Sequence, residues 1–310
     1  MIDLSTSSAA TDIARACEDI GFFSVIGHGV SADVLEQSWR AARDFFDLPL
    51  EVRLSVAMPY PGYPYGYSPL SGETLARSLG DATPPDRKHS FAIGPVTAPR
   101  HALTDPDEEF AWSPNLWPSE LPALRTSWTE RYLELSSLAS RLLSLMAVAL
   151  DLPPDWFDAS IDRHTSAMRA LDYPGVDDTS VAIGAGQWGA SAHTDYGTLT
   201  ILETDPDQPG LQVRRADDEW VDVDPPRGAL VVNLGDAMER WTNDRWRSTL
   251  HRVTVPAGRR QSIAFFHNAN WDAVIECLPT CREADEPPRH TPIAAGPHLM
   301  SKFRATVNRY

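Results

Sequence analysis

The sequence predicts a mixed α/β fold, mainly β, in which a jelly-roll core (a double-stranded β-helix) carries flanking N-terminal helices and one long packing helix. Apolar residues recur at helical spacing through much of the chain before residue 165, whereas short β-rich runs separated by turn residues dominate after it. The 310 residues, 42% of them hydrophobic, are enough to bury one large core. We therefore expect a single globular domain over residues 1–310.

The N-terminal third predicts three regular elements followed by irregular chain. In order they are a short helix over Thr11–Ile20, a strand over Phe22–Gly27, and an amphipathic helix over Ser31–Phe46 with Ser31 as its N-cap. Tyrosines and scattered prolines between residues 59 and 118 predict long connections, interrupted by a strand at His89–Ile93. Such loops often border a site, so this stretch is a candidate for a cavity wall.

One long helix separates the N-terminal region from the β-rich core. Residues Ser119–Leu150 carry apolar side chains at helical spacing and contain no proline after Pro122. Many short strands follow, which predicts a double-sheet jelly roll. They are expected over Ser166–Tyr173, Thr198–Glu203, Leu211–Arg214, Ala229–Leu234, Leu250–Val255 and Gln261–Phe266. A final helix is expected over His298–Arg309.

Composition and charge argue against several classes of partner. The chain has 43 acidic and 27 basic residues, a formal charge of −16 and a pI of about 4.9. Such a chain repels phosphate backbones and anionic membrane surfaces, so we expect neither nucleic acid nor a membrane as partner. The N-terminus lacks the features of a signal peptide, and no apolar run reaches the roughly 20 residues of a membrane span. Three cysteines are too few for a disulfide framework. We expect a cytoplasmic protein with no obligate protein partner.

A sparse set of polar residues in the C-terminal half predicts a metal site. His193 and Asp195 are two residues apart, so on an extended segment they point to the same face, and His251 from another strand can complete a facial triad. Two imidazoles and one carboxylate suit a non-haem Fe(II) that keeps open positions for substrate and dioxygen. Some catalytic zinc sites have the same donors, so the triad alone leaves the metal undecided.

A second polar pair follows the triad. Arg260 and Ser262 share one face of a predicted strand, and a guanidinium beside a hydroxyl forms a receptor for a carboxylate. This pair argues against zinc. Arg259 points to the other side of the strand, and we expect it to be a cation on the sheet surface.

These residues carry a resemblance to a known family. The chain resembles the isopenicillin N synthase-like branch of the Fe(II)/2-oxoglutarate-dependent oxygenases from about Met1 to Phe303. The motifs are His193-x-Asp195, His251, Arg260-x-Ser262 and Gly235-Asp236, with Ile2-Asp3-Leu4, Gly21-Phe22-Phe23 and Gly27-His28-Gly29 near the N-terminus. The resemblance implies an N-terminal non-haem dioxygenase region at residues 1–118 and a jelly-roll catalytic core with the Fe(II)/2-oxoglutarate site at residues 163–275.

The resemblance also implies a role for each site residue. His193, Asp195 and His251 would bind Fe(II), and the far carboxylate of the co-substrate 2-oxoglutarate would pair with Arg260 and Ser262. Tyr173 occupies the position where the family commonly places a tyrosine that hydrogen-bonds the co-substrate carboxylate. Leu171 stands where relatives often carry asparagine, so this part of the motif is only partly kept.

The activity implied is oxidation of an unactivated C–H bond of a small molecule with O2, most often hydroxylation, with release of succinate and CO2. Specialised metabolism is one setting for such a reaction. An iron oxidase of the same fold that does not use 2-oxoglutarate is an alternative, and there Arg260 and Ser262 would bind the substrate's own carboxylate. A non-enzymatic metal-containing ligand-binding protein is a remote alternative. The substrate is not determined, and residues 60–67, Arg87-Lys88 and 265–267 are candidates for its recognition.

Overall fold

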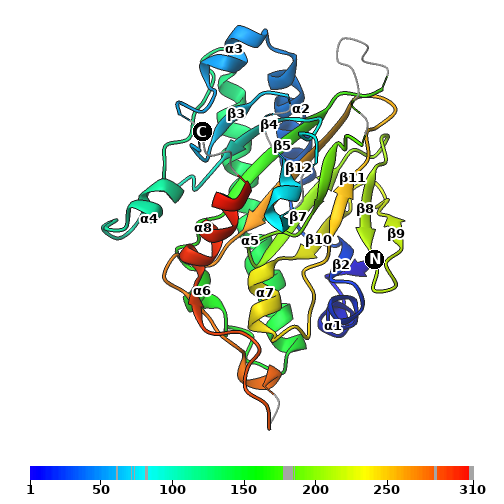
Figure 1. The fold of residues 1–310 in the computed structure, drawn as a ribbon, viewed down its shortest axis with the longest axis vertical. Coiled ribbons are helices and arrows are strands. Elements are labelled where there is room, and N and C mark those ends of the chain that lie inside the picture. The colour runs from blue at the N-terminus through cyan, green and yellow to red at the C-terminus, as the bar shows by residue number, and fades with distance from the viewer. Residues whose placement is uncertain are drawn as a thin grey trace.

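Two main β-sheets, with helices packed mainly on the side of the larger one, make up most of the molecule, which is a computed structural model (Figure 1). The structure describes residues 1–60, 62–70, 72, 74–80, 83–176, 184, 186–282 and 285–306. The helices are α1 (Ala9–Asp19), α2 (Ala32–Asp47), α3 (Leu50–Ser55), α4 (Pro106–Ala111), α5 (Pro122–Ala149), α6 (Asp158–Ile161), α7 (Asp236–Trp241) and α8 (Ala295–Thr306), with 3-10 turns η1 (Leu75–Leu79) and η2 (Pro279–Cys281).

The strands form one large and one smaller sheet, and all pairs in them are antiparallel except β1 with β2. The larger sheet contains, in spatial order, β1 (Ile2–Asp3), β2 (Phe22–Ile26), β10 (Leu230–Leu234), β7 (Leu199–Thr204), β12 (Arg260–His267), β5 (Ala167–Tyr173), β4 (His89–Ile93) and β3 (Gly66–Ser68). The smaller sheet contains β6 (Ala190–His193), β11 (His251–Val253), β8 (Leu211–Arg214) and β9 (Trp220–Asp222), and β13 (Val274–Ile275) pairs with β14 (Ile293–Ala294).

The outer face of the larger sheet packs against helices. Side chains alternate along a strand, so Met168 of β5 and Ile263 and Phe265 of β12 point to one side, where they are fully buried in the main hydrophobic core. There α5 contacts β7 and β12, and α1 and α2 pack against α5 (Figure 1). Ser31 caps α2 as expected, since its hydroxyl accepts a hydrogen bond from the Val34 amide at 3.4 Å.

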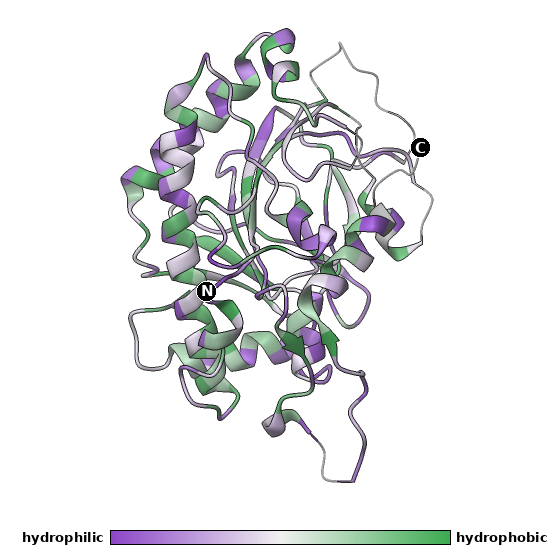
Figure 2. Ribbon diagram, turned by 90° about the vertical axis from the view of Figure 1, so that its left-hand side faces the viewer, coloured by the Kyte–Doolittle hydropathy of each residue, from purple (hydrophilic) through white to green (hydrophobic). Residues whose placement is uncertain are grey.

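The central helix α5 is long and apolar enough to cross a membrane by length and composition alone, although charged and polar residues interrupt its apolar residues. A core helix meets the same criterion. Trp128, Leu135 and Leu142 of α5 are fully buried in the main core. Hydrophobic and hydrophilic residues lie side by side along the outer helices (Figure 2). We therefore assign α5 to the core.

The inner face of the larger sheet faces the smaller sheet. Leu171 and Ala264 from the larger sheet share a hydrophobic cluster with Leu211 and Val253 from the smaller one. Beside this cluster, a cavity of about 210 Å³ extends to α4 and α8, which contribute part of its wall. The same strands thus carry the core on one face and a cavity on the other.

Most predicted elements form close to their expected ends. The strands β4 and β8 have the predicted bounds, whereas α5 begins at Pro122 rather than at Ser119. The final helix starts earlier than predicted, at Ala295, and residues 307–309 lie outside the described residues. The short elements α4, β6 and β9 were not predicted, because their residues show neither an alternation nor a helical spacing of large apolar side chains.

Candidate metal centre and co-substrate site

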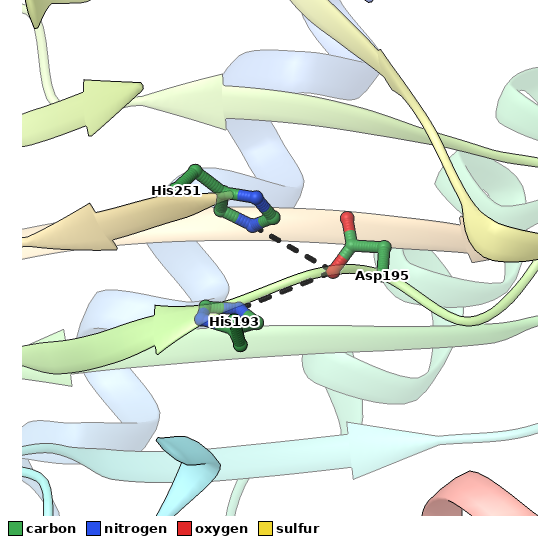
Figure 3. Close-up of side chains that lie close together, drawn as sticks. All are labelled: His193, Asp195 and His251. Carbon is green, nitrogen blue, oxygen red and sulfur yellow. Dashed lines mark ion pairs between the residues drawn. The ribbon is translucent and has the colours of Figure 1, made fainter. Parts of the chain in front are cut away.

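The three predicted metal ligands meet at the cavity. His193 ends β6, Asp195 follows in the next loop, and His251 begins β11 directly opposite His193. The Oδ1 atom of Asp195 lies 4.0 Å from Nε2 of His193 and 3.7 Å from Nε2 of His251 (Figure 3). One donor atom from each residue lies within 4.8 Å of the others. Donors that each lie about 2.1 Å from a shared ion are spaced at about 3–4 Å, so this cluster fits one metal ion.

Backbone carbonyl groups orient both imidazoles. Nδ1 of His193 donates to the carbonyl oxygen of Ser191 at 2.7 Å, and Nδ1 of His251 donates to that of Thr249 at 3.1 Å. Because a carbonyl group only accepts, the proton of each neutral ring lies on Nδ1. The lone pair on each Nε2 is therefore left to bind a metal.

The carboxylate of Asp195 is held by two side chains of the larger sheet. Its Oδ2 atom accepts hydrogen bonds from Thr200 of β7 at 2.5 Å and from Asn233 of β10 at 2.7 Å. These bonds leave Oδ1 directed at the two imidazoles (Figure 3). Neither Thr200 nor Asn233 was predicted as a site residue, because only the pairing of β7 with β10 brings them beside the loop of Asp195.

Burial and charge keep His193 and Asp195 in the protonation states that metal binding needs. Burial lowers the pKa of His193 to about 4, and the neighbouring His251 contributes to this lowering. Burial alone would raise the pKa of the Asp195 carboxyl, but His251, His193 and the two hydrogen bonds together lower it below its ordinary value. At neutral pH the centre therefore offers a neutral imidazole at His193 and an ionised carboxylate at Asp195.

A buried guanidinium lies in the same cavity. Arg260 is only 1% exposed, its Nε donates to the carbonyl oxygen of Gln208 at 3.1 Å, and its carbon Cζ lies 5.1 Å from the centre of the Tyr173 ring. Its Nη1 atom is buried without a hydrogen-bond partner among the described residues. An unpaired buried donor is costly, and a ligand carboxylate would satisfy it. Ser262 and Tyr173 line the cavity beside it.

The structure therefore brings all six predicted site residues to one cavity. Arg259 lies outside it, as expected, and forms ion pairs with Asp172 at 2.7 Å and with Asp47. The orphaned donor of Arg260 fits the distal carboxylate of 2-oxoglutarate, and the imidazole–carboxylate set fits Fe(II).

Some of the residues predicted to recognise the substrate line the cavity, and others are buried in the protein core. Lys88, Tyr65 and Phe266 line the cavity. Arg87 does not, because its side chain is fully buried and donates to the carbonyl oxygen of Gly175 at 3.3 Å. His267 lies in the core, where its Nδ1 is 2.7 Å from the Thr198 hydroxyl.

One charged residue of the wall was missed from the sequence. Arg169 lines the cavity from β5, two and four residues before Leu171 and Tyr173 on the same face of the strand. The alternation along this predicted strand could have identified it, since Tyr173 was already placed at the site.

Comparisons with known proteins agree with this site. A model of the 2OG-Fe(II) oxygenase superfamily matches residues 164–269, and a model described as the N-terminal region of non-haem dioxygenases in morphine synthesis matches residues 1–120. A 2-oxoglutarate-Fe(II) type oxidoreductase of Emericella nidulans is 34% identical over 305 residues, covering 96% of this chain and 84% of that protein.

Two further similarities span most of the chain. Homoarginine-6-hydroxylase of Arabidopsis thaliana is 34% identical over 285 residues, covering 91% of this chain and 82% of that protein. The crystal structure of a full-length Neurospora crassa protein in complex with alpha-KG (2-oxoglutarate) superposes with a TM-score of 0.84 at 29% identity, covering 98% of this chain and 95% of that one.

The chain belongs to the 2OG-Fe(II) oxygenase superfamily. It is a 2-oxoglutarate-dependent dioxygenase, and the cofactors of this family are Fe(II), 2-oxoglutarate and O2. The predicted jelly-roll fold and oxygenase activity are confirmed. The comparisons give no support to an oxidase that works without 2-oxoglutarate or to a protein without enzymatic activity.

Proposed function

We propose that this oxygenase hydroxylates a C–H bond of a small molecule at an iron held by His193, Asp195 and His251. The observation that carries the proposal is the presence, in one cavity, of this triad and of the buried Arg260 with its unsatisfied Nη1 donor. Bound iron, together with 2-oxoglutarate and O2, supplies the oxidising chemistry and yields succinate and CO2.

The chain's own residues position the reactants. Arg260 and Ser262 would bind the distal carboxylate of 2-oxoglutarate, with Tyr173 as a further hydrogen-bond donor, so that the keto acid end points toward the triad. Thr200 and Asn233 hold Oδ2 of Asp195, which keeps Oδ1 directed at the ion. Arg260, Ser262 and Asp195 are all buried, which strengthens these charged contacts.

A direct test measures chelation before turnover. Under anaerobic conditions the Fe(II) protein should develop a metal-to-ligand charge-transfer band when 2-oxoglutarate is added, and succinate release in air should require Fe(II). His193→Ala should abolish both signals. His290→Ala is the matched control, because this imidazole pairs with Asp244 outside the cavity. Succinate release that survives His193→Ala unchanged would refute the proposal.

A further inference from the structure

A buried carboxylate lies behind the cavity wall. Asp86 is 1% exposed and belongs to the segment between η1 and β4. It is not among the residues that line the cavity, so it is not placed to touch the metal ion or a ligand. Burying a carboxylate is costly unless hydrogen-bond donors surround it. The donors around Asp86 therefore indicate what it holds in place.

Donors from two separate elements meet at this carboxylate. Its Oδ1 atom accepts hydrogen bonds from the Ser191 amide at 2.9 Å and from the Ser191 hydroxyl at 2.7 Å. Its Oδ2 atom accepts from the Leu75 amide at 3.2 Å and from the Lys88 ammonium at 3.1 Å. The two shortest contacts go to Ser191 of β6 rather than to the cation. Asp86 is therefore more than the partner of a buried ion pair, since it joins η1 to β6.

Ser191 lies at an irregular step of the smaller sheet. The residue pairs on either side of this step are His193 with His251 and Ala190 with Val253. Between them β6 has two residues and β11 has one, which is the arrangement of a β-bulge. A bulge disrupts the regular ladder of hydrogen bonds between two strands, so the residues in it need other partners. The Ser191 amide finds one in Asp86.

The carbonyl group of the same residue orients a metal ligand. Nδ1 of His193 donates to the Ser191 carbonyl oxygen at 2.7 Å, which leaves Nε2 to bind the ion. A residue whose amide and side chain are both held has little freedom to rotate its carbonyl group. By holding the amide and the hydroxyl of Ser191, Asp86 fixes the acceptor that His193 needs.

Further contacts hold Asp86 beside β6. The side chain of Gln187 donates to the Pro85 carbonyl oxygen at 2.9 Å, and the Arg87 amide donates to the Trp188 carbonyl oxygen at 2.8 Å. The residues on either side of Asp86 are thus tied to the chain that leads into β6. This attachment makes the carboxylate a fixed support rather than a mobile one.

We propose that Asp86 is a positioning residue for the iron ligand His193, acting through the bulged Ser191. This inference rests on the proposed function, because it concerns the ligand set of the same metal site. Asp86 does not contact the ion, and its effect passes through the Ser191 carbonyl group.

The first test measures the affinity for Fe(II) by anaerobic competition with a chelator. Asp86→Asn keeps the size of the side chain, but one oxygen becomes an NH2 group that faces donors. Loss of a group that orients a metal ligand typically lowers metal affinity by about 10–100-fold, and Asp86 acts one residue further away, so the loss should be at least about fivefold.

Asp172→Asn is the matched control. Asp172 is also a buried carboxylate, 5% exposed, but it pairs with Arg259 on the outer side of the larger sheet. Both variants should have a lower melting temperature, because each leaves a buried cation without its carboxylate. Asp172→Asn should change the Fe(II) affinity less than twofold. Equal Fe(II) affinities in the two variants would reduce Asp86 to a purely structural role and overturn the proposal.

A second pair of variants separates position from charge. Ser191→Ala removes the hydroxyl group and leaves every charge in place, so it should also weaken Fe(II) binding, and Ser191→Thr should restore most of the affinity. Asp86→Asn combined with Ser191→Ala should bind Fe(II) no more weakly than Asp86→Asn alone, because both changes break one contact. Unchanged affinity in Ser191→Ala, or additive losses, would assign the effect of Asp86 to its charge and contradict a positioning role.

Cobalt supplies a readout of ligand geometry that does not depend on affinity or turnover. The visible absorption of Co(II) depends on the arrangement of its ligands, so at saturating Co(II) the spectrum of Asp86→Asn should differ from that of the wild type. Asp172→Asn should have the wild-type spectrum. If Asp86→Asn does not fold, the spectra and Fe(II) affinities of Ser191→Ala and Ser191→Thr decide the question.

The outcomes distinguish this role from the proposed function. If the wild-type Fe(II) protein forms no charge-transfer band with 2-oxoglutarate, the proposed function fails whatever the variants do. If the band forms and Asp86→Asn matches Asp172→Asn in Fe(II) affinity and Co(II) spectrum, only the role of Asp86 is refuted.

Discussion

The two faces of the larger sheet use the same strands for opposite purposes. On the outer face, Met168 and Phe265 are fully buried against apolar neighbours of the main core. On the inner face, one residue away, Arg169 and Phe266 line a cavity that contains a metal-binding triad and several buried charges. Neighbouring residues of one strand can therefore serve different purposes, one stabilising the core and the next lining the site, because successive side chains point to opposite faces of the sheet.

The largest expected effect is on the inner side. Asp195→Ala removes the charged ligand of the triad. Loss of a hydrogen bond that only supports a ligand costs up to about 100-fold in activity, so loss of the ligand itself should lower the rate of succinate release by more than this. Succinate assays and iron content measure the effect. Circular dichroism should show a folded protein, since the main core does not include Asp195. Iron-dependent turnover at wild-type rates would contradict the assignment.

On the outer face, Phe265→Ala should act on stability. Phe265 packs edge-on against Tyr132 of α5 with ring centres 5.1 Å apart, so the cavity left behind should cost about 3–5 kcal/mol of the free energy of unfolding. Denaturant titration measures this loss, while the KM for 2-oxoglutarate should stay within twofold of wild type. Phe266→Ala, one residue along, should do the reverse by altering substrate affinity with a smaller loss of stability. Equal effects of the two changes would remove the distinction between the faces.

Arg260→Gln should weaken co-substrate binding. Truncating one partner of a buried charge pair costs about 2–5 kcal/mol, which corresponds to a rise in KM for 2-oxoglutarate of about 30-fold or more. Arg259→Gln is the neighbouring control, because Arg259 pairs with Asp172 and Asp47 instead of facing the cavity. If Arg259→Gln raises the KM for 2-oxoglutarate more than Arg260→Gln does, the assignment of Arg260 to the co-substrate is wrong.

A smaller effect is expected from the support of the triad. Asn233→Ala removes one hydrogen bond to Asp195, and loss of such an outer contact typically lowers metal affinity by about 10–100-fold. Competition with a chelator measures the affinity for Fe(II). Val232→Ala, on the opposite face of β10, should lower the melting temperature and leave iron affinity unchanged. If the two variants bind iron equally, Asn233 does not support the centre.

The smallest effect concerns pH. Burial lowers the pKa of His164 to about 4, and its ring stacks on Tyr132 at 6.1 Å beside the outer core. In the unfolded chain His164 is protonated as the pH falls below about 6.5, whereas in the folded protein it stays neutral down to about pH 4. The free energy of unfolding therefore decreases as the pH falls through this interval. Melting temperatures between pH 7 and 5 should fall less steeply in His164→Phe. Identical slopes would show that His164 titrates normally in the folded protein.

The core and the triad were accessible from the sequence for different reasons. Apolar residues recur at helical spacing over residues 119–150 and alternate with polar residues over 211–214. The structure has the helix α5 and the strand β8 in these places. His193, Asp195 and His251 were identified by their donor chemistry together with the Arg260-x-Ser262 pair and the resemblance of these motifs to a known family. By contrast, Asn233 and Thr200 are ordinary polar residues of predicted strands, and nothing in their local sequence marks them as supports of Asp195.

The order of residues by itself determined the fold class, the donor set and the carboxylate receptor, because alternation and spacing are local properties of a chain. The tertiary structure alone decided which buried charges share the cavity. Lys88 and Arg169 are 81 residues apart in sequence numbering and lie on one face only because β4 pairs with β5 in a particular register. A shift of that register by one residue would turn one of the two side chains to the other face of the sheet. The pairing of strands, which sequence spacing does not specify, therefore decided which charged side chains line the cavity.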